Sequence, residues 1–198
     1  MISYLVALVL SYLVGSVPNG LICGKFLWNV DLREHGSRNI GATNAWRTIG
    51  KAAGILIFLL DFLKGVIAVY LGLIFVGPPL ALVLCGLMAI AGHSLSVFLH
   101  FKGGKGVATG LGVIAMLMPQ VTAIVFLAWL AIVYRTRFVS LGSIVAAAFV
   151  PILAWFFHYP REFVMFGVIA AALIIVRHKA NISRLLNGTE SKISAGGK

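Results

Sequence analysis

The sequence predicts an all-α, polytopic membrane protein with seven transmembrane helices, the N-terminus outside and the C-terminus in the cytoplasm. Of its 198 residues, 61% are hydrophobic and only 11% are charged, and the mean hydropathy is +1.04. Soluble domains contain about 45–50% apolar and about 25% charged residues. This excess of apolar residues indicates a membrane-embedded chain. It excludes a disordered chain, a coiled coil and a nucleic-acid-binding globule.

Seven apolar segments are long enough, allowing for tilt and burial, to be membrane helices. They are continuous rather than alternating runs, which is typical of helices and not of a β-barrel. In chain order they cover residues 2–26, 53–76, 80–99, 107–118, 120–134, 138–157 and 162–177. The fourth and fifth are short and are separated by Pro119, so one broken span, giving six in total, is the alternative.

The boundaries of these segments carry their own signals. The first segment has no basic start, and residues 15–20 do not form a small-x-small cleavage site, so we expect a retained helix rather than a signal peptide. Pro78 with Pro79 predicts a tight turn after the second segment, and Tyr159 with Pro160 predicts another after the sixth.

The positions of the cations predict the orientation. With seven spans, four segments share one side of the membrane: 27–52, 100–106, 135–137 and the tail from residue 178. That side, with the adjoining helix ends, holds every Lys and Arg except Lys64, inside a span, and Arg161, on the opposite side. Six spans would scatter the cations over both sides. Topology therefore explains the net charge of +11, and the basic side is predicted to be cytoplasmic.

The first cytoplasmic loop, residues 31–51, gathers Gly, Ser, Thr, Asn and Arg. Such a loop can present backbone N–H groups, hydroxyls and guanidinium groups to an oxyanion. A solvated loop is the alternative, because Ser37, Asn39 and Thr43 are ordinary capping and turn residues.

The second loop, residues 101–110, is rich in glycine and opens directly into a predicted helix N-terminus. Gly103, Gly104 and Gly106 would let the backbone approach a phosphate, and Lys105 adds a mobile cation. The helix terminus adds N–H groups and a partial positive charge. The spacing is not that of a Walker A loop. A flexible turn with cytoplasmic lysines is the alternative.

The last span ends in a third polar element. Arg177, Asn181 and Arg184 fall on one helix face, with His178 beside them. They are candidates for anion binding, or for an interfacial anchor whose long side chains reach the membrane surface. Ser140 and Ser143, at the start of the sixth span, are either phosphate donors or helix caps.

Two further observations narrow the chemistry. Asp61 and Lys64 form an i, i+3 pair inside the second span, with either a structural or a substrate-facing role. The sequence has only five carboxylates, no HEXXH motif, no Cys/His cluster, no G-x-S-x-G elbow and no His-x4-Asp box. We therefore expect no metal and no cofactor, and catalysis by positioning and charge stabilisation.

Five motifs occur in order over essentially the whole chain. They are Gly15-Ser16-x-Pro18-x-Gly20, Gly36-Ser37-x-Asn39-x-Gly41-Ala-Thr43-Asn44, Asp61-x-x-Lys64-Gly65, Lys102-Gly-Gly-Lys105-Gly-Val-Ala-Thr109 and Arg177-His178-x-x-Asn181-Ile-x-Arg184-Leu-x-x-Gly188-x-Glu190. In order and spacing they resemble the bacterial acyl-phosphate:glycerol-3-phosphate acyltransferases.

The resemblance implies a multi-pass enzyme of the bacterial cytoplasmic (inner) membrane, with one acyltransferase domain over residues 1–198. It implies transfer of a fatty acyl group from acyl phosphate to the 1-hydroxyl of glycerol-3-phosphate at the cytoplasmic face. The products would be lysophosphatidic acid, for phospholipid synthesis, and inorganic phosphate. The implied partners are these substrates, membrane lipids and, functionally, an enzyme that forms acyl phosphate.

The resemblance also assigns residues. The catalytic residues, expected to hold glycerol-3-phosphate, are Ser37, Arg47, Lys105, His178 and Asn181. The other substrate-binding candidates, which include those for the acyl-phosphate end, are Asn39, Thr43, Asn44, Gly103, Gly104, Gly106, Thr109, Ser140 and Ser143. We expect these groups to gather at the inner leaflet, where the glycerol hydroxyl would attack acyl phosphate directly.

Other mechanisms and classes stay open. Ser37 could instead act as a covalent nucleophile. A transporter of phosphorylated solutes would also need anion sites, but near the bilayer midplane and often with internal repeats. We find no repeat, and the polar clusters lie at one predicted face. A membrane scaffold would not need three phosphate-binding elements.

Overall fold

The computed structural model describes residues 1–193, which contain ten α-helices, one 3-10 helix and no strand. The prediction of an all-helical protein is confirmed for this part of the chain. The described residues form two compact units, residues 1–113 and residues 114–193. The single-domain interpretation stays a prediction.

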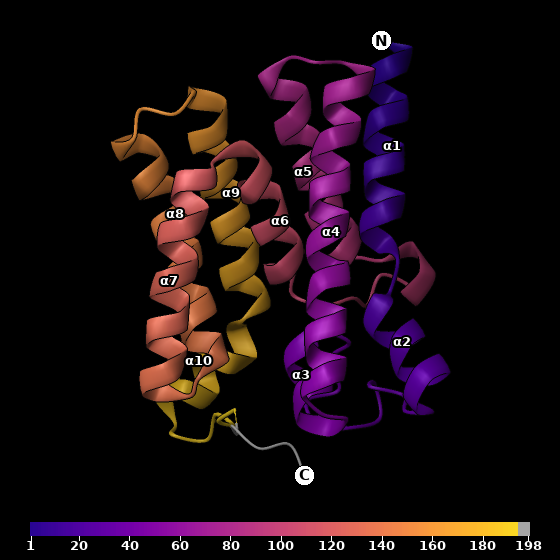
Figure 1. The fold of residues 1–198 in the computed structure, drawn as a ribbon, viewed down its shortest axis with the longest axis vertical. Helices are drawn as coiled ribbons and strands as arrows, with labels where there is room; N and C mark the ends of the chain where they lie inside the picture. Colours follow the sequence, from indigo (N-terminus) through magenta and orange to yellow (C-terminus); the bar gives the residue numbers. More distant parts are fainter. Residues whose placement is uncertain (194–198) are drawn as a thin grey trace. The chain divides into compact units, whose positions relative to one another are not determined.

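The first unit is built around three long helices that pack against one another in pairs, α1, α4 and α5 (Figure 1). Its elements are α1 (Ile2–Ser16), α2 (Asn19–Trp28), α3 (Ala42–Thr48), α4 (Lys51–Phe75), α5 (Pro79–Ser94), η1 (Val97–Leu99) and the start of α6 (Val107–Leu117). Close packing depends on glycine. A Cβ at Gly15 of α1 would collide with the Ala89 carbonyl of α5, and one at Gly92 of α5 would collide with the Tyr12 carbonyl of α1.

The first predicted segment is two helices rather than one, because the helix is interrupted between Ser16 and Asn19. Pro18 has no N–H, so it cannot continue the helical hydrogen bonds. Two side chains donate to carbonyls at the break, where the Val17 carbonyl also accepts the Asn19 N–H. The Ser96 hydroxyl donates to the Ser16 carbonyl at 2.6 Å, and Lys64 Nζ donates to the Val17 carbonyl at 3.0 Å. Inside a membrane such carbonyls have no water to bind, so these contacts stabilise the break.

Helix α4 has one exposed apolar face and one face buried against other helices. Ile55, Leu59, Leu63 and Ile67 recur every fourth residue and are each 44–50% exposed. The opposite face is buried and carries the Asp61–Lys64 pair. A helix with a fully apolar exposed face fits a hydrocarbon environment better than water.

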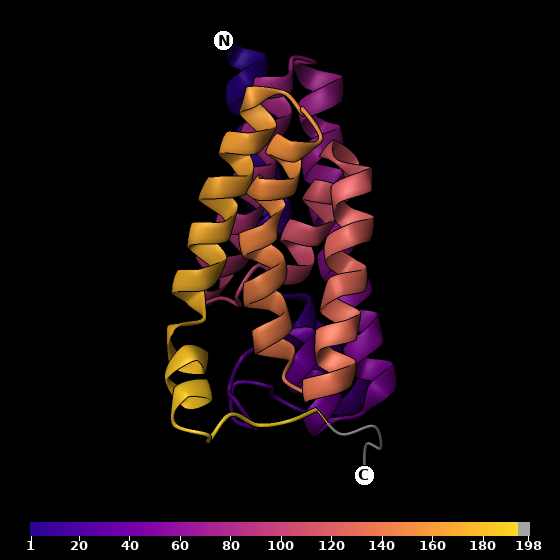
Figure 2. The ribbon, with the colours of Figure 1, turned by 90° about the vertical axis from the view of Figure 1, so that its left-hand side faces the viewer.

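The second unit contains α7 (Pro119–Thr136), α8 (Val139–Phe156), α9 (Arg161–Arg177) and α10 (Lys179–Leu186). Helix α8 packs between α7 and α9 (Figure 2). Pro119 occupies the first turn of α7, a position that tolerates proline because that N–H has no helical partner. Helices α9 and α10 meet at 61°, and His178 stands at the bend.

Five helical segments of the described residues are long and apolar enough to cross a membrane, and α9 with α10 would make a sixth. Helix α6 has 11 residues, so it is about 16 Å long, compared with a hydrocarbon core of about 30 Å. The helices therefore support a polytopic membrane protein, while the count of seven spans stays a prediction.

Candidate functional site

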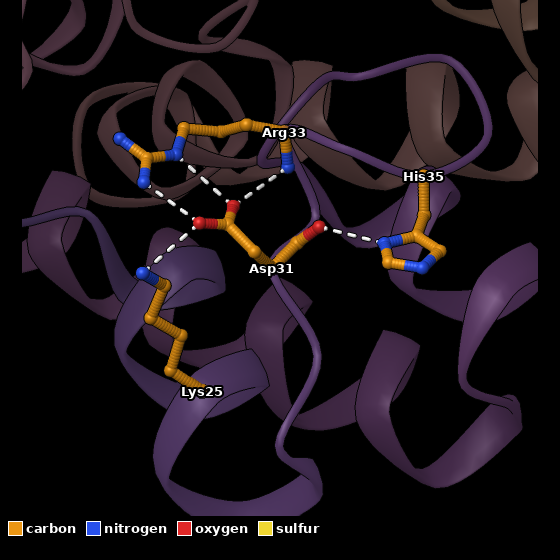
Figure 3. Close-up of polar contacts among 4 residues, drawn as sticks. All are labelled: Lys25, Asp31, Arg33 and His35. Atoms are coloured by element: carbon orange, nitrogen blue, oxygen red, sulfur yellow. Dashed lines mark hydrogen bonds and ion pairs between the residues drawn. The ribbon is translucent and has the colours of Figure 1, made fainter.

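The first polar loop begins with a charged cluster around Asp31 (Figure 3). The Asp31 carboxylate accepts hydrogen bonds from the Arg33 backbone N–H at 2.9 Å and from Arg33 Nε and Nη2 at 3.0 and 2.7 Å. Lys25 Nζ, at the end of α2, lies 3.0 Å away. Hydrogen bonds from Arg33, aided by Lys25, hold the pKa of Asp31 well below its usual range. The ionised carboxylate therefore ties the loop to α2. His35 Nδ1 lies 2.9 Å from the Asp31 carbonyl.

Asn44, at the start of α3, organises the rest of this loop. Its side chain is buried, and its Oδ1 accepts the Ser37 backbone N–H at 2.9 Å. Its Nδ2 donates to the carbonyls of Leu32, His35 and Asn39 at 2.9–3.1 Å. One buried amide therefore holds several residues of the loop together through hydrogen bonds to their backbone.

The remaining candidates in this loop differ in exposure. The Ser37 side chain is exposed, whereas Asn39 is half-buried and its Oδ1 accepts the Gly41 N–H at 2.9 Å. Thr43 and Arg47 are half-buried in α3, with Arg47 in its last turn. Asn39 and Asn44 are therefore loop-organising residues in this structure, and substrate contact by any of the five stays a prediction.

The glycine-rich loop, residues 102–106, packs onto the end of α5. The Gly103 N–H donates to the Ser94 carbonyl at 3.1 Å, and the Gly104 N–H donates to the His93 carbonyl at 3.0 Å. A Cβ at Gly103 would collide with the His93 carbonyl, and one at Gly104 would collide with the His93 ring nitrogen Nε2. Close backbone approach therefore requires glycine at both positions.

The loop then turns into α6. Gly106 has a φ of +79°, which favours glycine, and Lys105 before it is half-buried. Thr109, in the first turn of α6, is 0% exposed, and its hydroxyl has no hydrogen-bond partner among the described residues. A Cβ at Gly65 would collide with the Thr109 carbonyl, so α4 and α6 touch through their backbones here. A buried hydroxyl beside a helix N-terminus can donate to an anion.

In the second unit, Glu190 is the centre of a hydrogen-bond cluster. Its carboxylate accepts the Ser140 hydroxyl, Asn181 Nδ2 and Arg184 Nε, each at 2.7 Å. Burial alone would raise the pKa of the Glu190 carboxyl. The hydrogen bonds from Ser140, Asn181 and Arg184 outweigh burial, and the pKa is lowered. The cluster joins the start of α8, helix α10 and the tail.

His178 and Ser143 occupy neighbouring elements of this unit. His178 is buried, and its Nδ1 lies 2.7 Å from the Ile174 carbonyl. A carbonyl oxygen can only accept, so we assign a proton to Nδ1 there. The Ser143 hydroxyl donates to the Val139 carbonyl at 2.9 Å and accepts Trp129 Nε1 at 3.3 Å.

Sequence reasoning gave no site role to Glu190, Trp129 or His93. A signal existed for Glu190, because carboxylates are scarce and this one follows Asn181 and Arg184 within a short tail. No comparable signal marks His93 or Trp129, because single polar residues in apolar helices have no characteristic spacing.

Each unit thus belongs to a helical membrane protein whose loops and helix ends carry hydrogen-bond donors suited to phosphate groups. The chain belongs to the glycerol-3-phosphate acyltransferase family, whose model matches residues 5–188. It is therefore an acyltransferase.

Among its relatives, glycerol-3-phosphate acyltransferase 2 of Moorella thermoacetica is 50% identical over 96% of this chain and 97% of its own length. The glycerol-3-phosphate acyltransferase of Syntrophomonas wolfei is 48% identical over 94% of this chain and 95% of its own length. Two crystal structures of PlsY, an integral membrane glycerol 3-phosphate acyltransferase, are also similar.

The glycerol 3-phosphate form of PlsY has a TM-score of 0.92 and 42% identity, and the match covers 97% of this chain and 96% of that one. The lysophosphatidic acid form has a TM-score of 0.89 and 40% identity, over 96% of this chain and 95% of that one. The recognition made from the five motifs is confirmed.

Proposed function

We propose that the protein transfers a fatty acyl group from acyl phosphate to the 1-hydroxyl of glycerol-3-phosphate, giving lysophosphatidic acid and inorganic phosphate. The observation that carries this proposal is the glycine-rich loop of residues 102–106, whose glycines are required by close backbone packing and whose lysine precedes a helix N-terminus. The names of the related PlsY forms, with glycerol 3-phosphate and with lysophosphatidic acid, support the acceptor and the product.

The choice of acyl phosphate as donor is supported by how three of the five carboxylates are used. Asp31 pairs with Lys25 and Arg33, Asp61 pairs with Lys64, and Glu190 is held by three donors. Carboxylates engaged in this way are poor general bases. An acyl phosphate is already activated, so it needs charge stabilisation on the leaving phosphate more than it needs a strong base. A cellular enzyme that forms acyl phosphate would supply the donor.

Ser37, Arg47, Lys105, His178 and Asn181 are the residues that we propose to hold glycerol-3-phosphate. Arg47 and Lys105 would neutralise its phosphate, because two phosphorylated substrates repel each other unless cations offset their charge. With Nδ1–H donated to the Ile174 carbonyl, Nε2 of His178 would accept a glycerol hydroxyl when the ring carries one proton. Thr109, Ser140 and Ser143 remain substrate-binding candidates.

In the proposed reaction the glycerol 1-oxygen forms a bond to the acyl carbon, and the bond from that carbon to the phosphate oxygen breaks. The leaving phosphate accepts the hydroxyl proton, so no enzyme group changes its net protonation. The alternative route forms an acyl ester on Ser37. Trapping of an acyl-serine there, with activity lost in Ser37→Ala, would replace direct attack.

We also propose a bacterial cytoplasmic-membrane location with seven spans, the N-terminus outside and the polar loops in the cytoplasm. The distribution of Lys and Arg supports this orientation. Helix α6 is shorter than the bilayer core, but the loop before it can enter the cytoplasmic edge of the membrane, because the Gly103 and Gly104 N–H groups have carbonyl partners on α5.

One assay tests the function. Purified protein in detergent is mixed with palmitoyl phosphate and labelled glycerol-3-phosphate, and we expect labelled lysophosphatidic acid and one phosphate per product. Acyl-CoA in place of palmitoyl phosphate should give no product. Uptake of label into vesicles without product would instead indicate a transporter.

A further inference from the structure

A buried polar cluster in the first unit lies outside the proposed substrate-binding set. Asp61 and Lys64 of α4 form an ion pair at 3.0 Å, and both residues are less than 5% exposed. Asn19, at the start of α2, donates from Nδ2 to Asp61 Oδ1 at 3.1 Å. Nδ1 of His93, near the end of α5, lies 3.8 Å from the same oxygen. A carboxylate at membrane depth is expensive, so a role is expected for it.

The lysine of this cluster has a structural explanation that the carboxylate lacks. Lys64 donates to the Val17 carbonyl at the break between α1 and α2, where that carbonyl also accepts the Asn19 N–H. A neutral donor would satisfy that carbonyl without any counter-charge. The contact therefore explains a donor at position 64 but not the carboxylate, whose third neighbour is a histidine.

His93 connects the cluster to the glycine-rich loop. Its carbonyl accepts the Gly104 N–H at 3.0 Å, and the next carbonyl, that of Ser94, accepts the Gly103 N–H at 3.1 Å. The ring nitrogen Nε2 packs against Gly104 so closely that a Cβ could not be added there. The imidazole therefore stands with Nδ1 toward Asp61 and Nε2 against the loop, and it is only 5% exposed.

We propose that Asp61 and His93 are positioning residues that set the shape of the glycine-rich loop, and so the binding of the substrate phosphate by that loop. This inference rests on the proposed role of the loop. Asp61 Oδ1 lies 3.8 Å from Nδ1 and so orients the imidazole as its nearest carboxylate. The imidazole then holds Gly104 at the distance from α5 that places Lys105 and the start of α6.

Three substitutions of His93 separate positioning from packing. His93→Ala should raise the KM for glycerol-3-phosphate about tenfold or more, with a smaller change in kcat. His93→Gln keeps a polar group near the position of Nε2, so it should restore much of this KM. His93→Phe keeps the ring volume without nitrogen and should resemble His93→Ala. Thermal unfolding of each purified variant checks folding, and His158→Gln, at an exposed turn of the second unit, is the control.

A double-mutant cycle tests whether Asp61 acts through His93. Asp61→Asn keeps the shape and should raise the same KM. If the two residues act in series, the double variant Asp61→Asn with His93→Ala should be no worse than the more damaged single variant. If the fold-changes in KM of the two single variants instead multiply in the double variant, Asp61 does not act through His93.

The outcomes distinguish this inference from the proposed function. Rescue by His93→Phe but not by His93→Gln, or equal changes in the KM of both substrates, would overturn the positioning role. Lys105→Ala is run in parallel. If it raises the KM for glycerol-3-phosphate while the His93 and Asp61 variants are silent, only the inference fails. If Lys105→Ala is silent as well, the proposed role of the loop fails with it.

Discussion

At the scale of single residues, the polar side chains of the loops divide into those that hold the loops together and those that stay at least partly accessible to solvent. Asn44 donates to three backbone carbonyls and accepts one N–H, and Glu190 accepts three hydrogen bonds from side chains. Ser37 is exposed, and Arg47 and Lys105 are half-buried. We therefore expect substitutions of Ser37, Arg47 and Lys105 to change catalysis. Substitutions of Asn44 and Glu190 are expected to change stability.

Loss of one loop cation should reduce activity strongly. Lys105→Ala and Arg47→Ala are each expected to lower kcat/KM about 10²-fold or more, comparable to losing one donor that stabilises developing charge. Steady-state kinetics with palmitoyl phosphate and glycerol-3-phosphate measures this.

Tail lysines provide the matched controls. Lys192→Ala should be nearly silent, since Lys192 is exposed and contacts only the Phe138 ring in the described structure, at 5.6 Å. Lys198→Ala should be silent too, although Lys198 lies outside the described residues. Near-normal rates for Lys105→Ala, or a large loss for Lys192→Ala, would show that the site is misplaced.

The hydrogen-bonded carboxylate of Glu190 should make the stability of the folded protein sensitive to acid. Its pKa is lowered in the folded protein, so its contribution to the free energy of unfolding is complete above the ordinary pKa range of a glutamate and is lost as the pH falls through the folded pKa. Thermal unfolding in detergent should therefore show a falling Tm below about pH 4.

Glu190→Gln tests the origin of that sensitivity. The substitution removes the charge facing Arg184 and should lower the free energy of unfolding near pH 7 by about 1–3 kcal/mol. The variant should also lose part of the acid-dependent fall in Tm. If the Tm of Glu190→Gln falls at acid pH as steeply as that of the unsubstituted protein, the effect comes from other carboxylates.

At the scale of elements, the helices pack through glycines on one face while their other face stays apolar and exposed. Gly65 lets the backbones of α4 and α6 touch, whereas Ile67, two residues later, is 44% exposed. The same helix therefore has a tightly constrained face and a tolerant one.

Gly65→Val should push α4 and α6 apart, because its side chain would collide with the Thr109 carbonyl. We expect a loss of about 2 kcal/mol or more of stability and lower activity, since Thr109 is a binding candidate. Ile67→Ala on the exposed face is the control and should leave Tm and rate nearly unchanged. Equal Tm values for the two variants would contradict the close contact.

At the scale of the whole molecule, the placement of charge decides how the chain crosses the membrane. Seven spans put residue 161 outside and residue 179 in the cytoplasm, whereas six spans would exchange them. In a chain with Cys23→Ala and Cys85→Ala, Arg161→Cys should react with an impermeant maleimide in intact cells. Lys179→Cys should react only after lysis. The reverse pattern would indicate six spans.

The sequence predicted helices well but not how polar side chains are used within the loops. Predicted segments agree with helices because continuous apolar runs have few alternatives in a membrane. The first segment is nevertheless two helices, since the break at Val17 and Pro18 depends on partners from Lys64 and Ser96, far along the chain. Asn39 and Asn44 have the residue types of anion ligands, yet their hydrogen bonds go to the loop itself.

The amino-acid order alone determined the membrane character and the family, because hydropathy, charge and motif spacing are local properties of the chain. Tertiary structure alone decided which polar groups meet: Glu190 with Ser140 and Asn181, and His93 with Asp61 on one side and Gly104 of the glycine-rich loop on the other. Hydrogen bonds act over about 3 Å, and residues that are distant in sequence reach that separation only when helices pack.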